Sequence, residues 1–274
     1  MVHDGGVPAL IRVTPSPSLP PEVAVGADVG VHSMKDMTTT LQDGISLVGV
    51  LERGMIEDAL VSKGGLGLDE LPKGATVGSG SQRRGAMLRA ARPDLRVVPI
   101  RGNVPTRVAK VTEGDLDATV LARAGLVRLG LVEHMTEVLG VDRFLPAVGQ
   151  GIVGLTCRAS DDASAATIAA TIRDASAWAA ASAERAFLRD MKGGCNAPVG
   201  GHATISAGAL RLEGRVLSLD GSRSVAGHAE GSVADAEDVG RRTRKHIWRY
   251  GDAYASDEDD DEETQAAHRR RYGP

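Results

Sequence analysis

The chain has 274 residues, of which 25% are charged and 42% hydrophobic, and its formal net charge is −4. This length supports two or three domains with a sizeable core, and the balance of charges excludes a strongly basic surface. Aromatic residues make up only 3% of the chain, so stacking platforms for bases are not expected. We therefore predict a globular protein with no nucleic-acid partner.

Membrane and export signals are not visible in the sequence. No apolar run reaches the ~18 residues that a membrane helix needs. The N-terminus lacks a basic segment followed by an apolar core, so it is not a signal peptide. We predict a cytoplasmic protein with no membrane partner, and its two cysteines are expected to be reduced thiols.

Residues 1–26 are rich in Pro and Gly and form an atypical N-terminal segment without periodicity. After it, short runs rich in Val, Ile and Leu predict strands. They lie at 26–33, 45–51, 58–63, 75–80, 95–102, 116–124 and 151–157. Amphipathic segments at 81–94 and 104–115 predict helices between them. This alternation is typical of a mostly parallel, doubly wound sheet, which binds ligands at the carboxyl ends of its strands.

The pattern changes after residue 158. The Ala-rich stretch 161–191 predicts two helices with a break near Asp174, and Gly193 and Gly194 predict the helix end. Three strand-like segments follow, at 200–206, 209–218 and 222–231, and the pair Asp220–Gly221 predicts a hairpin turn. These elements indicate a small α+β domain. The basic and acidic blocks that follow show no apolar face, and we predict a disordered charged tail at 251–274.

Polar motifs follow the predicted strands: "HSMKD" at 32–36, "SGSQRR" at 79–84, "RGNVPTR" at 101–107 and "ARAGLVR" at 122–128. Their positions predict that they converge on one cleft. Arginine forks in such a cleft bind carboxylates or phosphates, and the helix opening at Ser81 adds N–H donors. Asp36 would be the lone acid, able to pair with a cationic nitrogen or pass a proton. The expected cations are Lys35, Arg83, Arg84, Arg101, Arg107 and Arg128.

Each motif taken singly also has a purely structural interpretation. Arg83–Arg84 can be a solvated helix face, His32 a structural histidine and Ser81 a simple N-cap. Cys157 ends a strand and is predicted to be a buried small hydrophobe. Cys195 follows Gly-Gly on a turn, where either a structural or a functional thiol fits. The joint arrangement of the motifs favours a site for a ligand with several negative charges.

The motifs also occur in the order of a known family. "HSMKD", "RRxxxLxxxRPDL" (83–95), "RGNVxTR", "AGLxRLGL", "LPAVGQG" (145–151) and "GGCxxPxG" (193–200) closely resemble porphobilinogen deaminase, also called hydroxymethylbilane synthase. The resemblance implies an α/β fold with two periplasmic-binding-protein-like doubly wound domains and a small α+β C-terminal domain. By position, domain 1 would hold 27–52 and 149–171, domain 2 would hold 53–148, and domain 3 would hold 172–250.

The resemblance implies a monomeric transferase of tetrapyrrole biosynthesis. Such an enzyme condenses four molecules of porphobilinogen into the linear tetrapyrrole hydroxymethylbilane and releases ammonia. The resemblance also implies that it needs no metal, and that a dipyrromethane cofactor is attached through a thioether to the cysteine that Cys195 matches. Asp36 matches the catalytic aspartate. The residues that would bind cofactor and substrate carboxylates are Lys35, Ser79, Ser81, Arg83, Arg84, Arg101, Arg107 and Arg128.

Two features depart from the family pattern and keep alternatives open. The "RxSxLA" and "KGLFxKE" segments that precede "HSMKD" in the family are not visible in residues 1–26, so domain 1 is expected to be incomplete. The alternative function is a truncated or degenerate paralogue that binds polycarboxylate pyrroles without turnover. A pure anion-binding module is a third possibility, and it gives Cys195 no role.

Overall fold

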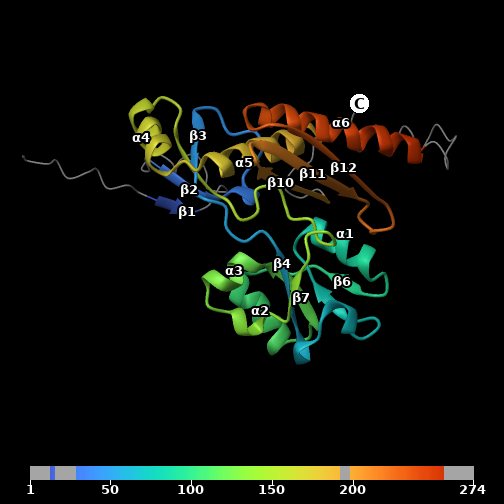
Figure 1. Ribbon diagram of the computed structural model, residues 1–274. Helices are drawn as coiled ribbons and strands as arrows, with labels where there is room; N and C mark the ends of the chain where they lie inside the picture. The colour runs from blue at the N-terminus through green and yellow to red at the C-terminus, as the bar shows by residue number, and fades with distance from the viewer. Residues whose placement is uncertain (1–12, 16–28, 192–197, 256–274) are drawn as a thin grey trace, which may run out of the picture.

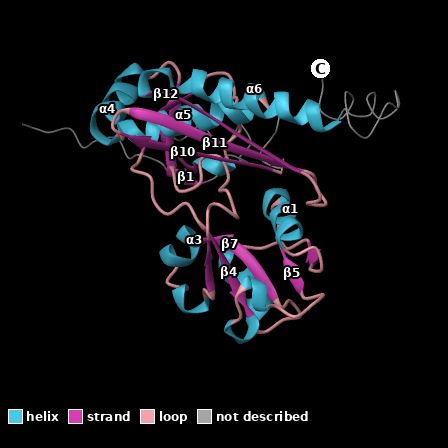
Figure 2. Cartoon of the chain, turned by 45° about the vertical axis from the view of Figure 1, so that its right-hand side comes forward, coloured by secondary structure: helices cyan, strands magenta, loops and turns pink. Residues whose placement is uncertain are grey.

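The computed structural model describes residues 13–15, 29–191 and 198–255. Their strands form three sheets. Figure 1 shows one lobe that contains α4, α5 and α6 with two of the sheets, and a second lobe that contains α1, α2 and α3 around the remaining sheet. The chain crosses between the lobes twice, before β4 and before β9, and Figure 2 shows the loops between the two lobes after a turn of 45° about the vertical axis.

The first sheet has the strand order β1-β2-β9-β3. Its strands are β1 (Val13–Pro15), β2 (Val29–Ser33), β9 (Val153–Arg158) and β3 (Ile45–Val50). The helix α4 (Asp162–Ile172) covers one face and buries Ile168 among β-branched and leucine side chains. Cys157 lies in this cluster at 3% exposure, as the sequence predicts, and burial raises the pKa of its thiol.

The second sheet has the strand order β6-β5-β7-β4-β8. Its strands are β4 (Asp58–Ser62), β5 (Thr76–Gly78), β6 (Arg96–Val98), β7 (Ala118–Ala122) and β8 (Glu137–Leu139). Its helices are α1 (Gln82–Ala91), α2 (Val104–Thr112) and α3 (Arg123–Arg128). Apolar side chains from α1 and from α2 form two separate buried clusters with the strands, so the sheet is covered as a doubly wound sheet requires.

The third sheet is an antiparallel meander of β10 (Val199–Ser206), β11 (Ala209–Leu217) and β12 (Ser224–Ser232). The helices α5 (Ala175–Asp190) and α6 (Ala236–Ala255) pack on it and on each other. The two helices approach so closely that a β-carbon at Gly240 would lie 2.3 Å from the carbonyl oxygen of Ala183. Only glycine fits at this crossing.

Most of the predicted elements are confirmed. The α/β class, the seven central strands, the paired helices and the three C-terminal strands are all present. Asp174 caps the start of α5, with its Oδ1 accepting the N–H of Ala177 at 2.6 Å. The turn at Asp220–Gly221 joins β11 to β12, and Gly221 has a φ of +78°. The helix end predicted at Gly193 and Gly194 lies outside the described residues.

The first and second sheets are mixed, so the prediction of a mostly parallel sheet is wrong. β4 runs antiparallel to β7 and β8, and β9 runs antiparallel to β2 and β3. The reason is the double crossing, because β4 and β9 each enter their sheet from the other lobe. β1 and β8 were not predicted, since three residues are too few to establish a period.

The helix α6 corrects the prediction for the C-terminal region. Ala236, Val239, Gly240, Thr243 and Ile247 are buried, at the spacing of one helical face. This stripe was missed because it is narrow and three of its members are small. The helix also reaches Ala255, so disorder from residue 251 is wrong for residues 251–255, and the rest of the predicted tail lies outside the described residues.

The junction of the three sheets is held by the buried carboxylate of Glu184 on α5. Its Oε1 accepts Nη1 of Arg53 at 2.5 Å and the N–H of Ala203 at 2.8 Å. Its Oε2 accepts the N–H of Gly149 at 2.7 Å. Arg53 and Gly149 belong to the two segments that cross between the lobes. The domain boundaries given above stay predictions. Within the described part of the chain, no helix is long and apolar enough to cross a membrane.

Candidate active site

The four polar motifs lie at the carboxyl ends of four strands, as the sequence predicts. The turn Met34–Asp36 follows β2 directly, and α1 begins four residues after β5. The segment 101–107 follows β6 and opens α2, while α3 follows β7 without a break. The first motif therefore comes from one lobe and the other three come from the second lobe (Figure 1).

A buried carboxylate that the sequence analysis missed lies among the arginines. Asp58, the first residue of β4, is 0% exposed. Its Oδ2 accepts Nη2 of Arg83 at 2.7 Å, and its Oδ1 accepts Nε and Nη2 of Arg84 at 3.0 and 2.7 Å. The two guanidinium groups overcome the effect of burial and hold the pKa of Asp58 well below its usual range. Asp36 is therefore not the lone acid of this region.

Arg83 and Arg84 differ in what they can offer a ligand. Both terminal nitrogens of Arg83 are engaged, one by Asp58 and the other by the carbonyl oxygen of Leu145 at 2.6 Å. Arg83 is 3% exposed, so the expectation that it binds ligand carboxylates does not fit this arrangement. Arg84 uses Nε and Nη2 and leaves Nη1 without a hydrogen-bond partner among the described residues.

Lys35 lies close to this network, in the turn after β2. Burial is the main reason that its pKa falls from 10.5 to about 8. Arg84 and Arg83 lower the pKa further, whereas Asp36 and Asp58 raise it. All four charges therefore reach the ammonium group, which places the first motif against the second. The side chain of Asp36 is exposed and makes no hydrogen bond or ion pair with another described residue.

Arg107 joins the same group from the first turns of α2. Its Nε donates to the carbonyl oxygen of Gly102 at 2.7 Å. A β-carbon at Gly80 would lie 3.5 Å from its Nη1, so the guanidinium lies against the turn that precedes α1. Burial and the charge of Arg84 lower the pKa of Arg107, and Asp36 raises it. We call Lys35, Arg84 and Arg107 the cationic cluster. Asp36 lies beside it.

Ser79 and Ser81 shape the turn between β5 and α1. The hydroxyl of Ser79 accepts the N–H of Ser81 at 3.3 Å and donates to its carbonyl oxygen at 3.1 Å. Ser81 is the N-cap of α1, and its Oγ accepts the N–H of Arg84 at 3.4 Å. Ser81 therefore contacts the backbone of Arg84 directly, and Ser79 fixes the turn that leads into Ser81.

The other predicted residues are not brought into the cluster. Arg101 and Arg128 are exposed, and within the described ranges neither guanidinium makes a hydrogen bond or an ion pair. Cys195 lies outside the described residues. His32 has the structural role that was weighed for it: its Nε2 lies 2.9 Å from Oγ1 of Thr156, between neighbouring strands. No group of three or more His, Cys, Asp or Glu among the described residues could hold a metal ion.

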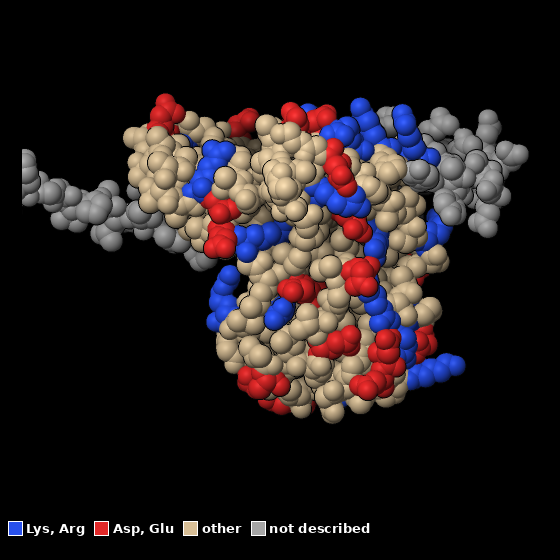
Figure 3. All heavy atoms as spheres, viewed as in Figure 1, with Lys and Arg blue, Asp and Glu red and all other residues tan. Residues whose placement is uncertain are grey.

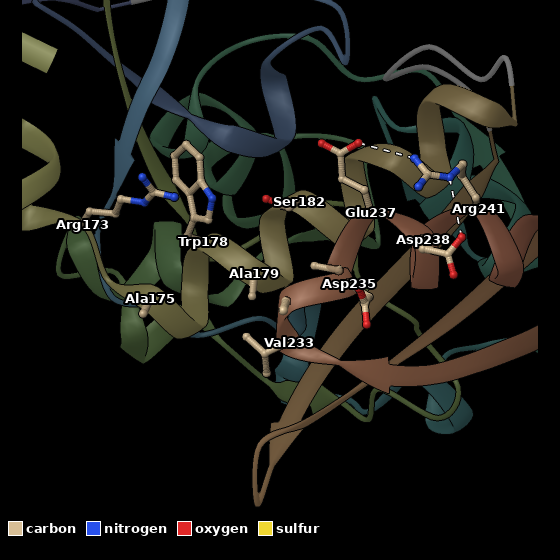
Figure 4. A pocket seen from close by; sticks show the side chains of 12 residues that line it. Arg173, Ala175, Trp178, Ala179, Ser182, Val233, Asp235, Glu237, Asp238 and Arg241 are labelled. Atoms are coloured by element: carbon tan, nitrogen blue, oxygen red, sulfur yellow. Dashed lines mark ion pairs between the residues drawn. The ribbon is translucent and has the colours of Figure 1, made fainter. Parts of the chain in front are cut away.

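A hollow of about 790 Å³ lies elsewhere, between α5 and the start of α6 (Figure 4). Trp178 faces it with Arg173 stacked on its ring at 3.6 Å. Three acids line it, Asp235, Glu237 and Asp238, and none of the predicted site residues does. These carboxylates would repel a polyanion, so the hollow is not the predicted site. Figure 3 shows both signs of charge mixed over one face of the molecule.

The fold is that of an α/β protein in which Lys35 of one lobe lies near Arg84 of the other. The sequence pattern described as "Porphobilinogen deaminase, dipyromethane cofactor binding domain" matches residues 23–166. The pattern "Porphobilinogen deaminase, C-terminal domain" matches residues 178–248. The chain belongs to the porphobilinogen deaminase family.

Individual relatives agree with this assignment. The chain is 44% identical to the porphobilinogen deaminase of Carboxydothermus hydrogenoformans over 213 residues, which is 78% of this chain and 68% of that protein. It is 47% identical to that of Desulforudis audaxviator over 224 residues, 82% of this chain and 72% of that protein. Among solved structures, the methionine-binding protein MetQ is similar over 53% of this chain and 69% of its own, with a TM-score of 0.37 and 16% identity.

Proposed function

We propose that this chain is a hydroxymethylbilane synthase, a transferase that condenses four molecules of porphobilinogen stepwise and releases ammonia. Membership of the porphobilinogen deaminase family supports the reaction. The single structural observation that carries the proposal is the cationic cluster, which joins Lys35 of one lobe to Arg84 and Arg107 of the other. Porphobilinogen carries two carboxylates, and each condensed unit adds two more. A ligand of this kind needs several fixed cations along its path.

The residues of the cluster take different roles in this proposal. Arg84 offers Nη1, which has no hydrogen-bond partner among the described residues, and Lys35 and Arg107 add positive charge near it. Ser81 orients the start of α1. Arg101 and Arg128, which are exposed, would meet carboxylates at the outer part of the site. Arg83 acts through Asp58 and Leu145, and not by touching the ligand.

Asp36 is the proposed catalytic residue. Loss of ammonia from the aminomethyl group leaves a positive charge on the pyrrole, and a nearby carboxylate stabilises that charge. The exposed carboxylate of Asp36 has no hydrogen-bond partner among the described residues, so it is available to the pyrrole N–H and to the departing amine. The same carboxylate can accept the proton that the attacking ring releases.

A covalent dipyrromethane on Cys195 is the proposed primer. When bound, this group supplies the free pyrrole carbon to which the first substrate is joined. Its carboxylates fit the cations of the cluster: among the described residues, Lys35 and Arg107 form no ion pair, and Arg84 pairs only with Asp58. We also propose that the protein is a monomer and that it is located in the cytoplasm.

Intact mass spectrometry tests the proposal. Purified chain supplied with porphobilinogen should gain the mass of two deaminated porphobilinogen units. Cys195→Ala should lose this gain, whereas Cys157→Ala, which removes a buried thiol from the first sheet, should keep it. A folded chain without the added mass would contradict the proposal. A chain that carries the added mass but consumes no further porphobilinogen would favour the alternative of a relative that binds without turnover.

A further inference from the structure

Asp58 is the least accessible charged group near the cationic cluster, and it makes the largest number of contacts there. Besides the two arginines, Nε2 of Gln150 donates to its Oδ1 at 2.9 Å. The same Nε2 donates to the carbonyl oxygen of Ile56 at 2.6 Å. Gln150 is 1% exposed and belongs to the segment that leads into β9, while Asp58 opens β4. The carboxylate therefore joins both crossing segments to α1.

The two oxygens of Asp58 bind different arginines. Asp58 uses Oδ2 for Arg83, whose second nitrogen is fixed by Leu145. It uses Oδ1 for Nε and Nη2 of Arg84, which are the two nitrogens on one edge of that guanidinium. An arginine held along one edge cannot rotate, so its remaining Nη1 has a fixed direction. Without Asp58, the guanidinium of Arg84, which is 7% exposed, would be a nearly buried charge without a carboxylate partner, and it would not be held in this position.

We propose that Asp58 is a positioning residue for the condensation reaction: its buried carboxylate holds Arg84 with Nη1 available to substrate carboxylates and sets the net positive charge that they meet. This inference rests on the proposed function. Asp58 touches neither substrate nor cofactor, because it is fully enclosed by protein side chains. It acts on the reaction indirectly: it holds Arg84 by hydrogen bonds, and its negative charge favours the charged form of Lys35.

Lys35 gives a readout that a merely structural role would not move. Four charges reach its ammonium: Arg84 and Arg83 lower its pKa, and Asp36 and Asp58 raise it. Burial is the largest cause, and together with these four charges it brings that pKa to about 8. Removing the charge of Asp58 leaves the two arginines less compensated, so the pKa of Lys35 falls further. An amine reagent labels only the neutral form of Lys35. The pH at which the labelling rate is half of its maximum, the labelling midpoint, therefore reports this pKa without any turnover.

The first experiment compares Asp58→Asn with a matched control in the full-length chain. The control is Asp69→Asn, because Asp69 also binds an arginine through both oxygens but lies at the surface. Competitive acetylation, read by peptide mass spectrometry, gives the labelling midpoint of Lys35. We expect a lower midpoint in Asp58→Asn and an unchanged one in Asp69→Asn. An unchanged midpoint in folded Asp58→Asn would overturn the electrostatic half of the inference.

Kinetics with porphobilinogen test the positioning half. We expect Asp58→Asn to lose roughly 10- to 100-fold in kcat/KM, mostly through KM, because charge-assisted hydrogen bonds to the substrate weaken. If Asp58→Asn does not fold, Arg83→Met and the double variant Asp58→Asn/Arg83→Met carry the test. The double variant removes Asp58 together with Arg83, so that Arg84 is the only arginine that loses its carboxylate partner. Its KM should exceed that of Arg83→Met by about 10-fold, and equal values would overturn the inference.

The two readouts separate this inference from the proposed function. A lower labelling midpoint for Lys35 in a chain that never consumes porphobilinogen would contradict the proposed function alone. Normal turnover in Asp58→Asn, with the midpoint of Lys35 unchanged, would contradict the inference alone. Both measurements use the full-length chain.

Discussion

Two buried carboxylates, Glu184 and Asp58, each bind arginine at a junction between lobes, yet they differ in what they leave open. Glu184 accepts hydrogen bonds only from groups that are themselves part of the scaffold: Arg53, Gly149 and Ala203. Asp58 holds Arg84 along one edge and leaves Nη1 without a partner among the described residues. A network in which every donor has an acceptor stabilises the junction but offers nothing to a ligand. A network with an unpaired N–H donor can bind a ligand that supplies the acceptor.

Glu184 also differs from Asp36, the proposed catalytic residue. Asp36 is exposed, and its carboxylate makes no hydrogen bond or ion pair with the described part of the chain, so the fold is not expected to depend on it. Glu184 is 0% exposed and joins three sheets. Substitutions at these two positions should therefore give opposite results.

The largest effect is expected for Asp36→Asn. Loss of a positioned acid–base group should lower kcat by about 10²- to 10⁴-fold. The midpoint of thermal unfolding should stay within error of the parent chain, because the side chain is exposed. Steady-state consumption of porphobilinogen and thermal melts measure the two quantities. A large loss of stability together with the loss of kcat would break the proposed division between chemistry and fold.

The next effect is expected for Glu184→Gln, which should destabilise the fold. Removing one partner of a buried ion pair costs about 3–5 kcal/mol of the free energy of unfolding. Denaturant titration measures the loss. Glu230→Gln is the matched control, because its ion pair with Arg211 is exposed and should contribute under about 1 kcal/mol. Similar losses in the two variants would contradict the role given to Glu184.

A smaller effect is expected from pH. The pKa of Lys35 lies at about 8, below the ordinary value of 10.5, so Lys35 is charged below pH 8 and neutral above it. KM for porphobilinogen should therefore rise by about 10-fold as the pH increases through 8, because one charge-assisted contact weakens. Lys35→Met should show a high KM without this step. The same step in Lys35→Met would assign the titration to another group.

The smallest effect is expected at Cys157. Its thiol is 3% exposed, and burial raises its pKa, so little thiolate forms at neutral pH. Treatment of the native chain with iodoacetamide should leave Cys157 unlabelled, and the unfolded chain should be labelled fully. Peptide mass spectrometry measures both. Rapid labelling in the native chain would show that α4 does not cover the first sheet as described.

The sequence predicted the elements that have strong local signals. Runs of Val, Ile and Leu located the central strands, and the Asp174 cap and the Asp220–Gly221 turn were visible because their residue types suit only a few conformations. The narrow stripe on α6 was missed, since Ala, Gly and Thr do not read as an apolar face. The mixed sheets were missed too, because strand direction depends on the crossings between lobes and not on local pattern.

The candidate site was predicted in part. Lys35, Asp36, Arg84 and Arg107 were all named, because polar motifs after strands indicate a common edge. Asp58 was not, although an acid at the start of an otherwise buried strand was the available signal. Its role depends on two arginines that lie 25 and 26 residues away, and no local pattern joins them.

The most direct test of the proposed hydroxymethylbilane synthase activity is the stoichiometry of the reaction catalysed by the purified full-length chain. Porphobilinogen consumed, ammonia released and tetrapyrrole formed would be measured together in one reaction. We expect four porphobilinogen molecules consumed and four ammonia molecules released for each hydroxymethylbilane. A folded chain with the covalent mass on Cys195 and an intact Lys35 titration, but with no release of ammonia on further porphobilinogen, would contradict it.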